Sequence, residues 1–141
     1  MDEEKVQALV AYVLAAAPRG VLQAHIVNRL YLIDVEWLRA TGFALTGAAW
    51  VLRGGGPWDE RVGRIVMDMG PSSATEPLSA AERMVADEVG RIGDSHALEE
   101  KVSQTEPIRS AREGQRLDLR LIQHHDADRS FVADGYWGRD R

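Results

Sequence analysis

The longest helical pattern in the chain is the stretch VLQAHIVNRLYLIDVEWLRATG, residues 21–42. Its larger side chains recur at the spacing of one helix face, at Leu22, Ile26, Arg29/Leu30, Ile33 and Trp37. Gly42 follows this pattern at the position where glycine favours the left-handed conformation that ends a helix. The stretch therefore predicts a helix over about residues 21–40.

Shorter helical patterns lie on both sides of this stretch. A helix is predicted over about residues 3–17, ended by Pro18 and Gly20. Further helices are predicted over about residues 58–69, 80–91 and 95–104, with a turn of helix over 107–112. Pro57 is interpreted as a first-turn proline, and residues 79–82 match a capping box. Residues 117–122 fit a strand or a short helix, and we favour the helix.

Residues 43–56 show no helical period. Trp50, Val51 and Leu52 fit a short strand, and the three glycines that follow indicate a break. No lysine follows these glycines as it does in a phosphate-binding loop, so a turn is the better interpretation. The predicted fold is mainly α, with α+β as the alternative. It is a compact single domain of about five to six helices, with a possible short strand or hairpin near residues 43–53 and in the C-terminal tail, residues 124–141.

Composition excludes several classes of protein. A length of 141 residues fits one domain, and the absence of cysteine excludes disulfides, thiolate zinc sites and a cysteine nucleophile. No apolar run approaches the ~20 residues of a membrane span. The first residues are acidic rather than basic, which predicts a cytoplasmic protein without a secretion signal. Residues 1–104 hold 10 basic and 15 acidic residues, a net charge of −5 that disfavours a nucleic-acid partner.

Two polar clusters are candidates for chemistry. His124, His125 and Asp126, with Asp128 close behind, could hold a metal ion, although a solvated stretch is the simpler interpretation. No cofactor, metal or catalytic set is therefore predicted, and the chain is not expected to be an enzyme. A metal-dependent enzyme built on the two histidines and Asp128 remains an alternative.

Four arginines in the second half are spaced 3, 4 and 4 residues apart: Arg109, Arg112, Arg116 and Arg120. On one continuous helix they would form a basic stripe able to meet phosphates, which is the basis of an alternative function as a small DNA-binding regulator. A solvated face paired with neighbouring acids is the simpler interpretation.

Three tryptophans surround the irregular segment, at Trp37, Trp50 and Trp58. They are expected to meet in space, either as core packing or as a partly exposed anchor for a partner, since tryptophan is enriched in binding hot spots.

The order of several short motifs resembles the Panacea domain, the family of bacterial and phage proteins that includes the SocA-like antitoxins. In the first half the motifs are Leu30-Tyr31, Asp34, Trp37, Thr41-Gly42, Leu45-Thr46, Trp50 and Gly56-Pro57. In the second half they are residues 78–82, 95–98, 105–108 and 111–114. The resemblance is strongest over residues 5–123, within a single Panacea-like domain spanning 1–141.

The resemblance implies a helical antitoxin that neutralises a co-encoded toxin by direct contact, and some relatives act as proteolytic adaptors. The expected partners are therefore a cognate toxin and, for an adaptor, a protease complex, with no membrane involved. We expect the contact surface near Tyr31, Asp34, Trp37, Trp50 and Trp58.

Overall fold

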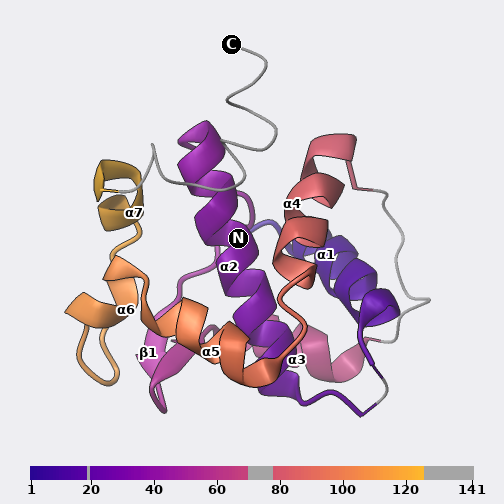
Figure 1. Cartoon of the computed structure of the whole chain (residues 1–141), viewed down its shortest axis with the longest axis horizontal. Helices are drawn as coiled ribbons and strands as arrows, with labels where there is room; N and C mark the ends of the chain where they lie inside the picture. The colour runs from indigo at the N-terminus through magenta and orange to yellow at the C-terminus, as the bar shows by residue number, and fades with distance from the viewer. Residues whose placement is uncertain (19, 70–77, 126–141) are drawn as a thin grey trace.

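The computed structural model describes residues 1–18, 20–69 and 78–125, and within them the chain forms seven helices and one small antiparallel sheet (Figure 1). The elements are α1 (Glu3–Ala16), α2 (Gln23–Thr41), β1 (Val51–Arg53), β2 (Gly56–Trp58), α3 (Glu60–Asp68), α4 (Ala80–Gly90), α5 (Ser95–Ser103), α6 (Glu106–Ser110) and α7 (Arg120–His125). The prediction of a mainly helical fold is confirmed. The predicted strand or hairpin in the tail lies outside the described residues, except for residues 124–125, which belong to α7.

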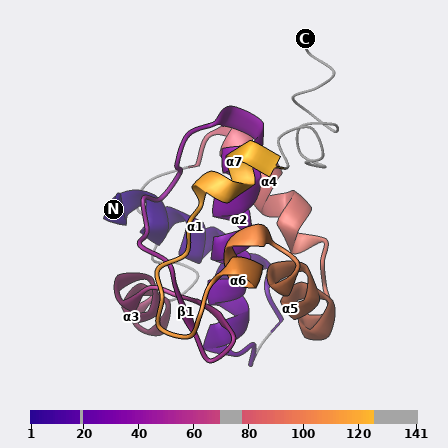
Figure 2. The same ribbon diagram turned by 90° about the vertical axis from the view of Figure 1, so that its left-hand side faces the viewer.

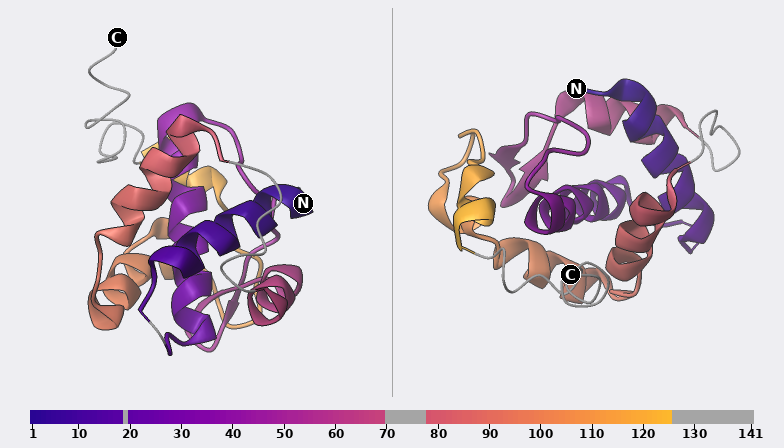
Figure 3. Two further views of the ribbon diagram at one scale, coloured as in Figure 1. Left: turned by 90° about the vertical axis from the view of Figure 1, so that its right-hand side faces the viewer. Right: turned by 90° about the horizontal axis from the view of Figure 1, so that it is seen from above.

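Helix α2 is the centre of the molecule. It contacts α1, α3, α4, α5, α7 and β2, and the view from above shows these elements arranged around it (Figure 3). Twelve of its 19 residues are buried, as expected for a helix enclosed on several sides. The prediction of one apolar stripe was too narrow, because Val27, Tyr31 and Val35 on other faces are also buried.

Several helix ends follow the sequence signals. The N–H of Gly42 (φ 78°) donates to the carbonyl of Leu38 at 2.8 Å and ends α2 in the left-handed conformation. Ser79 and Glu82 form the predicted capping box at the start of α4.

The segment around Pro57 differs from the prediction. Pro57 lies in β2, paired with Leu52 of β1, and α3 begins only at Glu60 after the N-cap Asp59. Gly54 and Gly55 both have positive φ, 61° and 82°, which is the geometry of a two-residue hairpin turn. Proline is tolerated here because β2 is at the edge of the sheet, where a missing N–H costs little. The glycines therefore form the hairpin, and the proline does not open a helix.

The segment after α6 runs beside β1 (Figure 2). Leu52 N–H donates to the Gln115 carbonyl at 2.9 Å, and Leu117 N–H donates to the Trp50 carbonyl at 2.9 Å. Residues 114–117 therefore extend the hairpin, and α7 begins only at Arg120. The favoured helix over 117–122 was wrong for its first residues, because these backbone bonds hold Leu117 beside β1.

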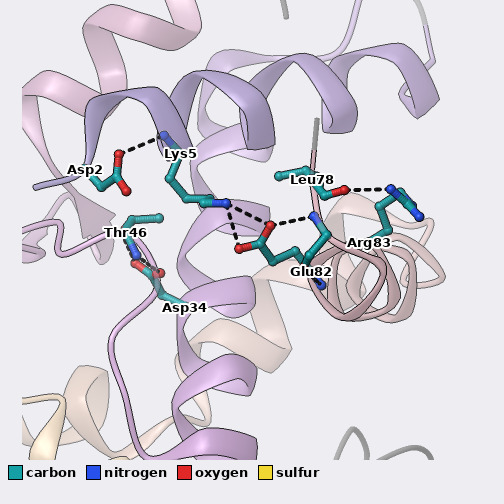
Figure 4. Close-up of polar contacts among 8 residues, drawn as sticks. Asp2, Lys5, Asp34, Thr46, Leu78, Glu82 and Arg83 are labelled. Atoms are coloured by element: carbon teal, nitrogen blue, oxygen red, sulfur yellow. Dashed lines mark hydrogen bonds and ion pairs between the residues drawn. The ribbon is translucent and has the colours of Figure 1, made fainter. Parts of the chain in front are cut away.

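An ion pair joins the first helix to α4. Lys5 Nζ lies 2.7 Å from Glu82 Oε2 and donates to Oε1 at 2.8 Å, while Oε1 also accepts the Ser79 N–H at 2.8 Å (Figure 4). Burial by itself raises the pKa of the Glu82 carboxyl, but the hydrogen bonds from Lys5 and Ser79 outweigh it and hold that pKa below its ordinary value. The carboxylate thus serves both the helix cap and the contact between helices.

We expect the Lys5–Glu82 pair to contribute about 1–2 kcal/mol of coupling energy, more than an exposed pair, because both side chains are largely buried. A double-mutant cycle with Lys5→Met and Glu82→Gln, followed by urea unfolding, measures it. Glutamine preserves the capping box, so loss of the cap does not confuse the result. A coupling energy near zero would show that the pair contributes nothing.

Candidate partner-binding groove

The five residues predicted to form a contact surface separate into two groups. Tyr31, Asp34 and Trp50 are buried, whereas Trp37 and Trp58 are partly exposed. The first three cannot touch a partner in this conformation, so their placement on a contact surface was wrong. Asp34 and Tyr31 both contact Trp50, and all three form part of the core.

Asp34 fastens the irregular segment to α2. Its Oδ2 accepts hydrogen bonds from Thr46 Oγ1 at 2.5 Å and from Trp50 Nε1 at 2.8 Å, and its Oδ1 accepts from the Thr46 N–H at 3.2 Å. Figure 4 shows the contact between Asp34 and Thr46. Burial raises the pKa of Asp34 to about 6, although these three donors oppose the shift. The carboxylate therefore positions the irregular segment that leads into the hairpin.

Tyr31 joins the same core from the other side. Its ring meets that of Trp50 edge-on, with centroids 5.7 Å apart, and its hydroxyl lies 2.8 Å from Thr105 Oγ1. Thr105 Oγ1 donates its own proton to the Val102 carbonyl, so Tyr31 is the donor in this pair. Burial raises the pKa of the Tyr31 hydroxyl. These contacts tie α2 to the hairpin and to the junction of α5 and α6.

An open groove of about 630 Å³ lies between the hairpin and α5, over the first turns of α2. Val27 and Asn28 of α2 line it, together with Pro57 and Trp58 of β2. Helix α5 contributes four exposed polar side chains: His96, Glu99, Glu100 and Ser103. The groove thus combines an aromatic ring and an acidic wall, and of the predicted contact residues it includes only Trp58.

Neighbouring residues hold Trp58 in place from several directions. The Arg53 guanidinium lies 5.2 Å from the centre of the ring, and Nε1 donates to Glu60 Oε2 at 2.9 Å. The ring edge packs on Gly63 of α3, where a Cβ would lie only 2.5 Å from Cζ2 and Cη2. A fixed aromatic ring loses little conformational entropy when a partner binds. Trp58 is therefore a preorganised part of the groove wall.

We expect Gly63→Ala to displace the Trp58 ring. Alanine normally stabilises a helix interior by about 1 kcal/mol relative to glycine, but here the added methyl group would clash with the ring. The measurement is the position of the Trp58 indole N–H signal in a ¹⁵N NMR spectrum, with Gly90→Ala as the matched control because its Cβ meets no atom closer than 3.6 Å. An unmoved Trp58 signal in Gly63→Ala would contradict this packing.

Ser95 and His25 also lie within hydrogen-bond distance of each other near the groove, but the direction of this hydrogen bond is wrong for catalysis. Arg29 Nε donates to His25 Nε2 at 2.9 Å, so the neutral ring carries its proton on Nδ1, which lies 2.9 Å from Ser95 Oγ. Burial, and then the Arg29 charge, lower the pKa of His25 and favour this neutral form. A histidine that donates to the serine cannot take its proton. This cluster therefore links α2 to α5 and does not activate Ser95.

The four arginines of the predicted basic stripe are all exposed but do not share a helix. Arg109 lies on α6 and Arg120 begins α7, while Arg112 and Arg116 lie in the connection between them. Arg109 pairs with Glu106 at 3.3 Å and Arg120 with Asp118 at 2.9 Å. The single continuous helix that a stripe requires is not formed, because α6 ends at Ser110 and the chain then pairs with β1.

The residues of the metal hypothesis lie only partly within the part of the chain that the structure describes. Asp126 and Asp128 lie outside the described residues, as do the side chains of His124 and His125, so the metal hypothesis stays a prediction. Among the residues that the structure describes, no group of three potential His, Cys, Asp or Glu ligands converges. None of the described helices is long and apolar enough to cross a membrane.

Sequence reasoning did not identify the acidic wall of the groove. The available signal was the adjacent pair Glu99-Glu100 on a predicted helix, but only the fold brings that pair opposite the hairpin.

Comparison of the chain with family models, with curated proteins and with solved structures gives no match in any of the three.

Proposed function

We propose that this chain is an antitoxin-like, protein-binding module that acts in the cytoplasm and neutralises a co-encoded toxin by direct contact. The observation that carries the proposal is the preformed groove, which is lined by a fixed, partly exposed tryptophan and by two exposed carboxylates. Tryptophan anchors are typical of protein-binding sites. Opposite charges also speed association and select the partner.

The charge of the groove favours a protein partner over DNA. Glu99 and Glu100 would repel a phosphate backbone, and the net charge of the chain is −5. Two of the four stripe arginines already pair with acids on their own segments. The Ser95–His25 pair, with its proton directed toward the serine, gives no support to a hydrolytic function.

Co-expression with the neighbouring reading frame tests the proposal. We expect the neighbouring gene to stop growth of a bacterial host when expressed alone and to be harmless with this chain, and the two proteins to copurify. An unchanged toxin level in the rescued cells indicates neutralisation by contact, whereas a falling level indicates the adaptor role. A neighbour that is not toxic, or a rescue without a complex, would contradict the proposal.

A gel-shift experiment with DNA from upstream of the gene tests the alternative function. We expect no shift at low salt. A shift that weakens steeply as salt increases would instead support a DNA-binding regulator, because such salt dependence reports phosphate contacts.

A further inference from the structure

We propose that the groove between the hairpin and α5 binds an extended segment of the partner that alternates basic and apolar side chains. The basic side chains would face Glu99 and Glu100, and the apolar ones would lie on Trp58. This inference rests on the proposed function, because it specifies the partner surface that the module recognises.

The acidic wall is available for a cation. Glu99 and Glu100 are both exposed and both line the groove. Within residues 1–18, 20–69 and 78–125, neither carboxylate forms an ion pair. An arginine or lysine placed between them would gain charge-assisted hydrogen bonds without displacing an existing partner.

The opposite wall offers little to an anion. Arg53 already stacks on Trp58 and lies 3.5 Å from Glu60. The backbone N–H groups of the glycine turn are also engaged, since Gly54 donates to Glu113 Oε2 at 2.7 Å and Gly55 to Oε1 at 3.5 Å. A carboxylate of this chain therefore occupies the anion-binding face of the turn, and the groove selects for positive charge.

The apolar part of the groove suits an extended segment. Val27, Pro57 and Trp58 line its apolar side, and of these three only Trp58 is partly exposed, while the acidic wall is on α5. Side chains of an extended chain alternate between two directions, so successive residues can reach the carboxylates and the aromatic ring in turn. The acidic wall and the Trp58 ring together therefore require a partner segment that has both basic and apolar side chains.

The probes for this test are two capped ten-residue peptides, one alternating arginine with leucine and the other alternating glutamate with leucine. We expect the arginine peptide to shift the Trp58 indole N–H signal in ¹⁵N NMR titrations and to leave that of the buried Trp50 in place. The glutamate peptide should shift neither. Binding of the glutamate peptide at Trp58, or no shift with either peptide, would overturn the inference.

Two variants localise the binding. Glu99→Gln with Glu100→Gln should weaken binding of the arginine peptide about tenfold or more, because it removes both charges. Gly56→Leu should abolish it, because a Cβ at Gly56 would lie 3.7 Å from Asn28 Oδ1, where a longer side chain enters the groove. Glu3→Gln with Glu4→Gln removes the same charge at the start of α1 and should leave binding unchanged. Equal weakening by both double variants would show only a net-charge effect and overturn the inference.

Failure of this inference can be distinguished from failure of the proposed function. If the neighbouring gene product is neutralised in a complex that the groove variants do not weaken, the proposed function stands and the inference fails. If the arginine peptide binds the groove but no toxin is neutralised, the groove assignment stands and the proposed function fails.

Discussion

Asp34→Ala is expected to lower the free energy of unfolding by about 3 kcal/mol at pH 7, the largest effect of any single change considered. The substitution leaves the Thr46 N–H, the Thr46 hydroxyl and the Trp50 indole without their acceptor inside the core, and unsatisfied buried donors cost about 1–3 kcal/mol each. Urea unfolding measures the loss, which corresponds to a melting temperature lower by roughly 10 °C.

Asp68→Ala is the matched control for this prediction. Asp68 is an exposed aspartate at the end of α3, and surface substitutions of this kind change stability by about 0.5 kcal/mol or less. A loss in Asp34→Ala no larger than in the control would show that the Asp34 contacts do not hold the irregular segment to α2.

Asp34 should also make stability depend on pH in an unusual direction. Its pKa of about 6 in the folded chain lies above the ordinary 3.8, so between these values the folded chain holds a proton that the unfolded chain has released. Stability from this group is therefore fully present below about pH 4 and is lost as the pH rises through 6. Asp34 contributes a total of about 3 kcal/mol to the free energy of unfolding in this way, because its pKa is roughly two higher in the folded chain than in the unfolded chain.

Comparison of the native chain with Asp34→Asn isolates this effect, because asparagine does not titrate. We expect the difference in unfolding free energy, native minus variant, to fall as the pH rises from 4 to 7. The Trp50 indole proton, which is bonded to Asp34, should shift with a midpoint near pH 6. A midpoint below pH 4.5 would mean that the three donors outweigh burial.

The sequence predicted the elements whose signals are local. Most of the helices, and the caps at Gly42, Ser79 and Glu82, depend on neighbours a few residues away and appear close to their predicted positions. The predicted short strand near residues 50–52 is confirmed as β1, but β2 was missed because a proline after glycines fits both a helix start and an edge strand. The pairing of Pro57 with Leu52 of β1 separates the two interpretations.

The candidate site was harder to predict because burial depends on the whole fold. Tyr31, Asp34 and Trp50 are residue types that serve equally well in a core or in an interface. They are enclosed because α2 is surrounded by other elements. Trp58 stays at the surface because β2 is an edge strand, and the acidic wall comes from α5, about forty residues later in the chain.

The most direct test of groove-mediated protein binding is titration calorimetry of the purified neighbouring gene product with the native chain and with Gly56→Leu. We predict tight binding to the native chain and an affinity at least about 30-fold lower for the variant, a loss of about 2 kcal/mol, with the thermal unfolding of the variant unchanged. Equal affinity for the two proteins would contradict a partner held in this groove.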